Sequence, residues 1–297
     1  MASAFPALKT ALIARPQWDW SSPIGAGDDH SPAITLSPSI QQEGTPDSRL
    51  VNAPLQHLSL CTPDRMMLDR FRWSQQQWLV LTSPASVQAL DQWLFHTGIN
   101  VMFNPDMRVA AVGSGTKAQL AHYIAQNAAD PARAWRINAG RTITSAIDEK
   151  ADAVGLLAAM DEVCLRDGFY WQEQVVLIAQ GQNSRTTLVH GLRERGATVL
   201  AANLYRRIDV SWPDTTWDML AAAAPQEVAV VVTSTTVVDR LLQEYQAHEL
   251  ALTHVVWATQ HAAIAERLRL RGIQTIRRVH LDASHLAGDL FEHEQYW

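Results

Sequence analysis

The sequence predicts an α/β protein with two similar lobes, each built on a mostly parallel sheet flanked by helices. One pattern occurs twice: residues 79–87 and residues 230–238 both consist of a short apolar run, then Thr-Ser, then an amphipathic segment. A second strand-to-helix pattern follows in each half, at 109–116 and at 254–261. A chain of 297 residues is long enough for two domains with separate cores. The repeated design therefore indicates two lobes that present helix N-termini and hydroxyl groups to one ligand, preferably an anion.

Strands and helices alternate along the first half of the chain. Val87, Leu90 and Leu94 have the spacing of one helix face. Between 17 and 49 the composition changes to Ser, Pro, Gly and Asp, which predicts a loop or a poorly ordered insert. The stretch 128–152 is ambiguous, with a weak strand at 135–138. The predicted strands are 11–14, 55–60, 78–81 and 109–112, and the predicted helices are 65–73, 84–97 and 116–126.

The alternation continues through the second half. Gly196 and Gly272 stand where a glycine commonly stops a helix. Strands that alternate with helices of ten or more residues imply parallel sheets with right-handed crossovers. The predicted strands are 175–179, 198–205, 228–232, 255–257 and 275–279, and the predicted helices are 153–166, 186–195, 212–224, 237–247, 262–271 and 284–293.

Composition and charge exclude several classes of protein. A net charge of -6 argues against general nucleic-acid binding, which requires a basic face. Cys61 and Cys164 belong to no CxxC pair or Cys/His cluster, so we expect reduced thiols and no metal site. No stretch approaches the ~20 apolar residues of a membrane span, and residues 1–16 contain no long apolar signal segment. We therefore expect a cytoplasmic protein. The eleven tryptophans are expected in the core and at interfaces rather than on a stacking platform.

The sequence contains none of the common catalytic motifs, such as GxSxG, HExxH or a P-loop. Gly113-Ser114-Gly115 lacks the third glycine of a dinucleotide fingerprint, so it favours a tight turn at a helix start, with Thr116 as N-cap. This turn either contacts an anion or only caps its helix. Thr82-Ser83 and Thr233-Ser234 lie where strands lead into helices, and they too are either caps or ligand contacts.

The most specific pattern lies in residues 175–207. It comprises a strand, a turn from Gly181 to Arg185, a helix that ends in Gly-Ala, and a strand that ends in Tyr205-Arg206. This pattern resembles the signature region of the uroporphyrinogen-III synthase family. Other segments resemble further family motifs in the same order: Ala14-Arg15-Pro16, Thr82-Ser83-Pro84, and the turn from Val112 to Thr116.

Two segments depart from the family pattern. Residues 18–47 are rich in Pro and Gly where the family has an amphipathic helix, and the second Gly-x-x-Thr turn reads Ala258-Thr259-Gln260-His261. The first departure concerns packing in the first lobe, and the second concerns ligand binding at that turn.

The resemblance implies two lobes joined by a pair of antiparallel strands. The first lobe would comprise 1–56 and 208–297, the second 57–207, and the hinge strands about 54–60 and 203–209. A hinge of two strands allows the lobes to close around a ligand.

The resemblance also implies an activity: cyclisation of hydroxymethylbilane, a linear tetrapyrrole with many carboxylates, to uroporphyrinogen III. The last ring is inverted through a spiro intermediate. Such a lyase works mainly by positioning its substrate, and no cofactor or metal is expected. Tyr205 matches the family's tyrosine and would donate a proton to the departing hydroxyl, or it only packs at the hinge. The expected substrate-binding residues are Arg15, Thr82, Ser83, Ser114, Gly115, Thr116, Gly181, Arg185, Thr233, Ser234 and Gln260.

Other interpretations remain open. A catalytically inactive relative of the family could bind an anionic ligand between its lobes without turnover, and a nucleotide-dependent enzyme is a third possibility. Arg206 and Arg207 either add positive charge to the ligand site or lie on a solvated face. The expected partner is a small-molecule linear tetrapyrrole, with no nucleic acid and no membrane. We expect a monomer that makes at most a transient contact with the preceding enzyme of the pathway.

Overall fold

The contacts in a computed structural model divide the described chain into two compact units. Unit 1 contains the described residues up to 58 and from 207 onward, and unit 2 contains the described residues from 59 to 206. The described residues are 8–14, 17–18, 49–62, 65–71, 77–96, 107–128, 139–145, 153–280, 286–291 and 296.

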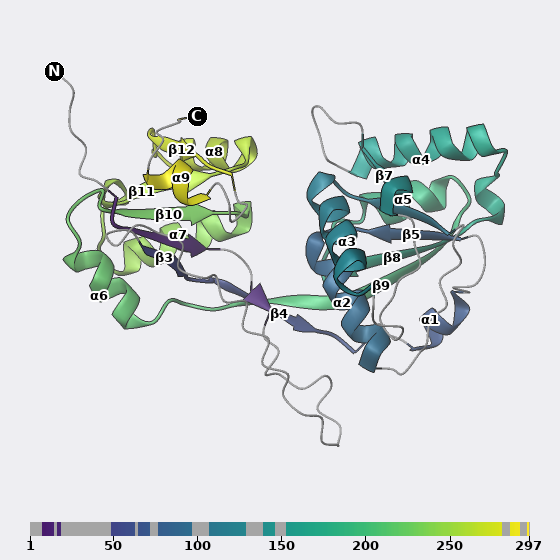
Figure 1. The fold of residues 1–297 in the computed structure, drawn as a ribbon, viewed down its shortest axis with the longest axis horizontal. Helices are drawn as coiled ribbons and strands as arrows, with labels where there is room; N and C mark the ends of the chain where they lie inside the picture. Colours follow the sequence, from purple (N-terminus) through teal and green to yellow (C-terminus); the bar gives the residue numbers. More distant parts are fainter. Residues whose placement is uncertain are drawn as a thin grey trace. The chain divides into compact units, whose positions relative to one another are not determined.

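The sheet of unit 1 has five parallel strands in the order β12-β11-β10-β1-β3 (Figure 1). Its strands are β1 (Thr10–Ala14), β3 (Arg49–Asn52), β10 (Val228–Val232), β11 (Val256–Thr259) and β12 (Ile276–Arg278). The other elements of the unit are α6 (Asp214–Ala222), α7 (Thr235–Ala247), a 3-10 turn (Leu252–His254), α8 (Ala262–Arg269) and α9 (Leu286–Phe291).

Successive residues of β1 pack on opposite faces of this sheet, as the two-residue period of a strand requires. Leu12 belongs to the core cluster that α6, α7 and α8 complete, and Ile13 belongs to the cluster that contains Leu290 of α9. Because both faces are covered, β10 is buried at all five positions and is a continuous valine-rich run.

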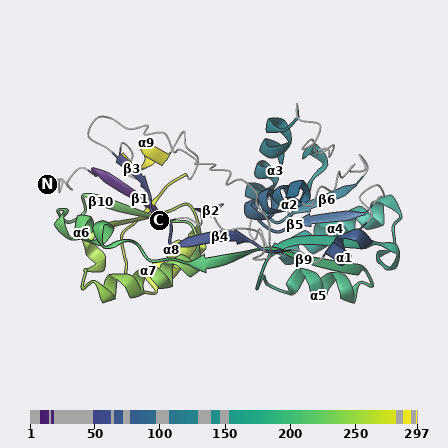
Figure 2. The same ribbon diagram turned by 90° about the horizontal axis from the view of Figure 1, so that it is seen from below.

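The second sheet has seven strands in the order β2-β4-β9-β8-β5-β6-β7. Its strands are β2 (Gln17–Trp18), β4 (Gln56–Leu60), β5 (Trp78–Leu81), β6 (Arg108–Ala111), β7 (Ile143–Thr144), β8 (Val175–Gly181) and β9 (Thr198–Asp209). The helices of unit 2 are α1 (Arg65–Arg70), α2 (Pro84–His96), α3 (Ser114–Gln126), α4 (Ala153–Asp167) and α5 (Thr187–Glu194), with 3-10 turns at Ala139–Arg141 and Trp171–Glu173. Figure 2 shows α2 and α3 on one face of this sheet and α5 on the other.

Strands β4 and β9 are antiparallel and cross the division between the two units. Cys61 donates its backbone N–H to the Leu204 carbonyl at 2.8 Å, and Val210 donates to the Leu55 carbonyl at 3.0 Å. From Leu55 to Cys61 the residue numbers rise, whereas those of their partners fall from Val210 to Leu204. The two strands are therefore antiparallel. The predicted hinge strands at 54–60 and 203–209 overlap β4 and the end of β9, and their role as a hinge stays a prediction.

Five parallel strands in each sheet share one spatial order, but the chain begins at a different strand of that order in each unit. Numbered in chain order, the strands of unit 1 read 2-1-3-4-5 from β3 to β12. The corresponding strands of unit 2 read 5-4-1-2-3 from β9 to β7, which is a circular permutation of the same order. Strand β5 therefore corresponds to β10, and β8 corresponds to β1. In each sheet the chain continues from one strand of this central pair toward one edge of the sheet, and from the other strand toward the opposite edge. The central pair is therefore the topological switch point of its sheet.

The prediction of an α/β fold with mostly parallel sheets flanked by helices is confirmed, and several bounds are corrected. The strands β3 and β7 were not predicted, and β9 continues four residues beyond its predicted end at 205. The predicted loop at 17–49 begins and ends in strand residues, and its interior lies outside the described residues, as does the weak strand at 135–138. Helix α3 begins at Ser114 rather than at Thr116.

Candidate functional site

The predicted site residues of unit 2 lie toward the carboxyl end of its sheet, and several of them lie where the chain leaves the two switch-point strands. β5 and β8 are parallel neighbours, and Leu81 pairs with Ala179 at their ends. Thr82 and Ser83 follow β5 directly, and Gly181 ends β8. In open α/β sheets this place is where ligands bind, since the loops of neighbouring strands diverge there.

Tyr205 extends from β9 across the end of β8 to the turn after β5. Its hydroxyl and the Ser83 hydroxyl share a hydrogen bond of 2.9 Å, and the tyrosine side chain is only 2% exposed. The strand order β9-β8-β5 puts Gly181 between these two residues. A Cβ atom added to Gly181 would lie 2.8 Å from Cζ of Tyr205, so only glycine leaves room for the ring to cross. The local irregularity in the β8–β9 pairing, at Gln180 and Gly181, brings Tyr205 into register with this glycine.

Thr82 and Ser83 fix the turn that starts α2. The Thr82 hydroxyl donates to the Ala179 carbonyl at 3.0 Å, which ties the turn to the end of β8. Ser83 and Ser86 cap the helix reciprocally: Ser86 N–H donates to Ser83 Oγ at 3.1 Å, and Ser83 N–H donates to Ser86 Oγ at 3.2 Å. Ser86 was not predicted as a site residue, although its position three residues after Ser83 has the spacing of a capping pair. Ser83 Oγ thus serves both as a cap and as the partner of Tyr205.

The turn after β8 is held by its own side chains. Ser184 donates its hydroxyl to the Gly181 carbonyl at 2.6 Å, and Gln182 donates its backbone N–H to the Tyr205 carbonyl at 2.6 Å. Asn183 has a φ of 60°, a conformation that asparagine adopts more readily than most residues. This geometry leaves Arg185 exposed just before α5, and among the described residues no carboxylate pairs with it.

The turn after β6 differs from its prediction. Gly113 occupies the N-cap position of α3 with a φ of 79°, and Ser114 is already the first helical residue. Thr116 is therefore not the N-cap: its side chain is 2% exposed, and its hydroxyl donates to the Val112 carbonyl at 2.8 Å. Ser114 and Gly115 are exposed, and no atom lies within 4 Å of the place where a Cβ of Gly115 would be. The helix N-terminus thus offers backbone N–H groups that an anion can approach closely.

In unit 1 the predicted residues lie at the corresponding positions of its own sheet. Thr233 and Ser234 follow β10, and Ser234 is the N-cap residue of α7. Its hydroxyl shares a hydrogen bond of 2.8 Å with the Thr236 hydroxyl and makes none with the helix backbone. Ser234 therefore does not cap its helix through its side chain, whereas Ser83 does. Arg15 directly follows β1, the other switch-point strand, and lies outside the described residues.

The turn after β11 contains the altered family motif. Thr259 is fully buried, and its hydroxyl accepts a hydrogen bond of 3.2 Å from His261 N–H. Gln260 is exposed, two residues before α8 begins. This threonine orients the backbone of the turn, as Thr116 does after β6, and it was not predicted as a site residue. The equivalence of the two turns in the strand order is the signal that could have found it.

Five helix N-termini adjoin these turns, three in unit 2 and two in unit 1. They belong to α2, α3 and α5, and to α7 and α8. The first N–H groups of a helix have no carbonyl partner within the helix and lie at the positive end of its dipole, so a helix N-terminus suits carboxylate groups of a ligand. Within the described ranges no group of three or more His, Cys, Asp and Glu residues could hold a metal ion, and no helix is long and apolar enough to cross a membrane.

The fold and these turns define a class of protein: a two-unit α/β protein whose mostly parallel sheets present hydroxyls, glycine turns and helix N-termini at the carboxyl ends of their strands. The model of one family, described as uroporphyrinogen-III synthase HemD, matches residues 51–279, which is most of the chain. The chain belongs to the uroporphyrinogen-III synthase family.

Solved structures of this family are similar to the chain at low sequence identity. A mutant uroporphyrinogen III synthase from the extremely thermophilic bacterium Thermus thermophilus is 16% identical with a TM-score of 0.44, and the match covers 76% of this chain and 81% of that one. The uroporphyrinogen-III synthetase of Helicobacter pylori is 14% identical with a TM-score of 0.44, and the match covers 91% and 95%. No curated protein matches the chain.

Proposed function

We propose that this protein converts linear hydroxymethylbilane to uroporphyrinogen III, closing the macrocycle with inversion of the last ring. The observation that carries the proposal, beyond the family match, is the buried pair formed by the Tyr205 and Ser83 hydroxyls at the switch point of a parallel sheet. A tyrosine hydroxyl that is hydrogen-bonded to a serine hydroxyl, placed where α/β folds bind ligands, suits the transfer of a proton to a departing hydroxyl.

The substrate's carboxylates would bind to the helix N-termini and to unpaired cations. In unit 2 the N-terminus of α3 is accessible at Ser114 and Gly115, and Arg185 is exposed beside the N-terminus of α5. Thr233 and Ser234 would contribute from the equivalent turn of unit 1, together with Arg15 and Gln260. Charge on these groups matters more than the net charge of -6, because screening limits the range of a charge to ~8 Å at physiological salt.

The chemical step requires a leaving hydroxyl and a controlled ring closure. Tyr205 would give its proton to the substrate hydroxyl, which leaves as water, and the carbon left behind becomes electrophilic. The already substituted carbon of the last ring then attacks this centre and forms a spiro intermediate. That intermediate opens and closes again with the ring inverted, and loss of a ring proton restores the tyrosine. Closure at the unsubstituted carbon needs no enzyme, so the protein's contribution is mainly orientation.

In this mechanism Ser83 is a positioning residue. Its hydroxyl holds the Tyr205 hydroxyl in the free protein, and the substrate hydroxyl would replace or join it as a hydrogen-bond partner. The reciprocal cap with Ser86 keeps Ser83 in place during this exchange. The proposed step uses no metal or cofactor, so the enzyme would be a lyase that works with its side chains alone.

The experiment that tests this proposal is isomer analysis of the product. The purified protein is supplied with bilane generated in situ, and the products are oxidised to porphyrins and separated. We expect mainly the type III isomer, whereas the reaction without protein gives type I. Type I alone in the presence of the protein would refute the enzyme. If the protein also retained the bilane tightly in that case, it would be an anion-binding relative without turnover.

A further inference from the structure

A pocket in unit 2 lies away from the turns described above. It has a volume of about 290 Å³ and is lined by Met66, Met67, Arg70, Arg193, Val199, Leu200 and Ala201. Its strand residues belong to the start of β9, whereas Tyr205 belongs to a later part. At about 3.3 Å per residue, Ala201 and Tyr205 are ~13 Å apart along the strand. The pocket is therefore not part of the Tyr205 site.

Among the described residues, no strand pairs with the pocket side of the start of β9. Thr198 donates its backbone N–H to the Gln174 carbonyl at 3.0 Å, on the side of β8. Because backbone groups alternate along a strand, the N–H groups of Val199 and Ala201 point away from β8. Within the described part of the chain, strand β4 pairs with the outer edge of β9 from Leu204 onward, where Cys61 donates its N–H to the Leu204 carbonyl. The wall of the pocket therefore contains the backbone N–H donors of Val199 and Ala201 as well as apolar side chains.

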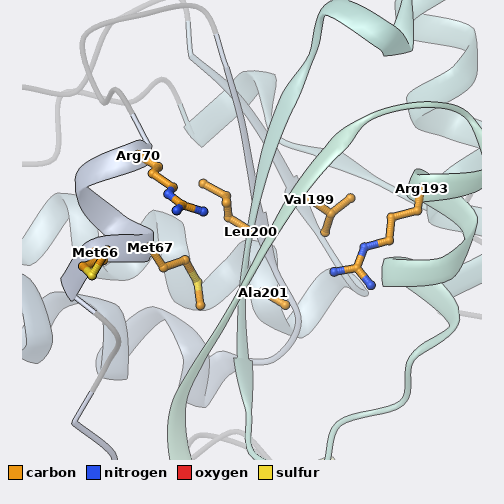
Figure 3. A pocket seen from close by; sticks show the side chains of 7 residues that line it. All are labelled: Met66, Met67, Arg70, Arg193, Val199, Leu200 and Ala201. Atoms are coloured by element: carbon orange, nitrogen blue, oxygen red, sulfur yellow. The ribbon is translucent and has the colours of Figure 1, made fainter.

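Two arginines face this pocket from different helices. Figure 3 shows Arg70 of α1 and Arg193 of α5 on opposite sides of β9, each with its guanidinium turned toward the strand. Among the residues that the structure describes, no carboxylate pairs with either arginine. The neighbouring Arg195 shows the contrast, because Asp161 binds it through hydrogen bonds of 2.8 and 2.7 Å. Both pocket cations are thus available to a ligand.

We propose that this pocket binds a small organic dicarboxylate, with one carboxylate on Arg70, the other on Arg193 and the connecting carbons against Met67 and Leu200. Two cations on opposite sides favour two separated anionic groups over one phosphate. Guanidinium groups bind carboxylates in a bidentate manner, and methionine side chains adapt to an aliphatic chain. The volume is at the lower end of the range for small-molecule sites, which suits a molecule of this size.

Nuclear magnetic resonance of methyl-labelled methionine tests the proposal at the pocket itself. Met66 and Met67 are two of seven methionines, and Met66→Leu and Met67→Leu assign their signals. The probes are succinate, glutarate and adipate, with butyrate and inorganic phosphate as comparisons. We expect saturable shifts at Met66 and Met67 with one dicarboxylate length preferred, at a dissociation constant of about 1 mM. Butyrate and phosphate should each bind at least about fivefold more weakly.

Charge variants separate this site from general attraction of anions. Arg70→Gln and Arg193→Gln should each weaken dicarboxylate binding about fivefold, while Arg141→Gln, which removes an exposed arginine outside the pocket, should leave it unchanged. The signal of the buried Met160 reports whether each variant is folded. The proposal is overturned if no shift at Met66 or Met67 saturates below about 50 mM, if phosphate binds as well as any dicarboxylate, or if Arg141→Gln has the same effect.

Discussion

The Tyr205 hydroxyl lies 2.9 Å from Ser83 Oγ, although 122 positions separate the two residues in the sequence. Three features of the fold bring them together. The strand order places β8 alone between β9 and β5, the glycine at 181 leaves room for the ring, and the cap with Ser86 fixes Ser83. The hydroxyl pair is therefore a consequence of the sheet topology, and each feature can be changed separately.

Replacing Tyr205 by Phe tests the hydroxyl. We expect kcat to fall about 100-fold, because a general acid contributes roughly 10²–10⁴ to a rate. The free energy of unfolding should fall by no more than about 1 kcal/mol, the worth of one neutral hydrogen bond. Steady-state kinetics with isomer analysis and urea unfolding give the two quantities. Tyr170→Phe, at a tyrosine that is 70% exposed, is the matched control and should change neither. Normal turnover in Tyr205→Phe would remove this residue from the chemistry.

Replacing Gly181 by Ala tests whether the Tyr205 ring needs the space above residue 181 to reach Ser83. The new methyl group would lie 2.8 Å from Cζ and 2.9 Å from Cε2 of Tyr205, so the ring has to move. We expect a loss of stability of about 1–3 kcal/mol, typical of overpacking, together with a loss of turnover. The stability cost should largely disappear in a Tyr205→Leu background, which a double-mutant cycle measures by urea unfolding. An equal cost in both backgrounds would place the clash elsewhere.

Replacing Asp161 by Asn tests the pair that ties α4 to the end of α5. Burial alone would raise the pKa of Asp161, but hydrogen bonds from Arg195 and Trp171 outweigh it and hold the pKa below its ordinary value of 3.8. A lowered pKa in the folded state gives stability that is present above pH 3.8 and is lost as the pH falls through the folded pKa.

The expected cost of Asp161→Asn at pH 7 is therefore at most about 1 kcal/mol, since the carboxylate is 38% exposed, and it should shrink toward pH 3. Urea unfolding at the two pH values measures it. Glu162→Gln, at the exposed neighbouring position of the same helix, should show no such pH dependence. A cost that is the same at both pH values would mean that the charge of Asp161 does not contribute.

The order of strands and helices could be predicted because long periodic segments such as 84–96 and 235–247 carry a local signal. The short strands β3 and β7 could not, since their residues become strand only by pairing with β1 and β6. The same limit explains the error at Thr116. Its hydroxyl was expected to cap a helix, but the helix begins two residues earlier and the hydroxyl bonds back to Val112.

The candidate site was predictable only one turn at a time. Thr-Ser after an apolar run and Gly before a polar turn are local patterns, and the family resemblance singled out Tyr205. The contact of Tyr205 with Ser83 depends on a strand order in which β8 and β9, late in the chain, lie beside the earlier β5. A permuted order of this kind leaves no trace in spacing or composition, so the pairing of the two hydroxyls appears only in three dimensions.

Replacing Gly115 by Ala tests whether a ligand approaches the backbone at the start of α3. Inside the free protein nothing opposes the change, because no atom lies within 4 Å of the new methyl group. Alanine is also the better helix former, so the free energy of unfolding should stay the same or rise by about 0.5 kcal/mol. A substrate carboxylate bound to the N–H groups of this turn would meet the methyl group, and we expect KM for the bilane to rise about tenfold with little change in kcat. Unchanged stability together with a raised KM would have no structural explanation other than a ligand at this helix N-terminus. An unchanged KM would mean that the substrate does not approach Gly115, and the turn after β6 would then have a structural role only.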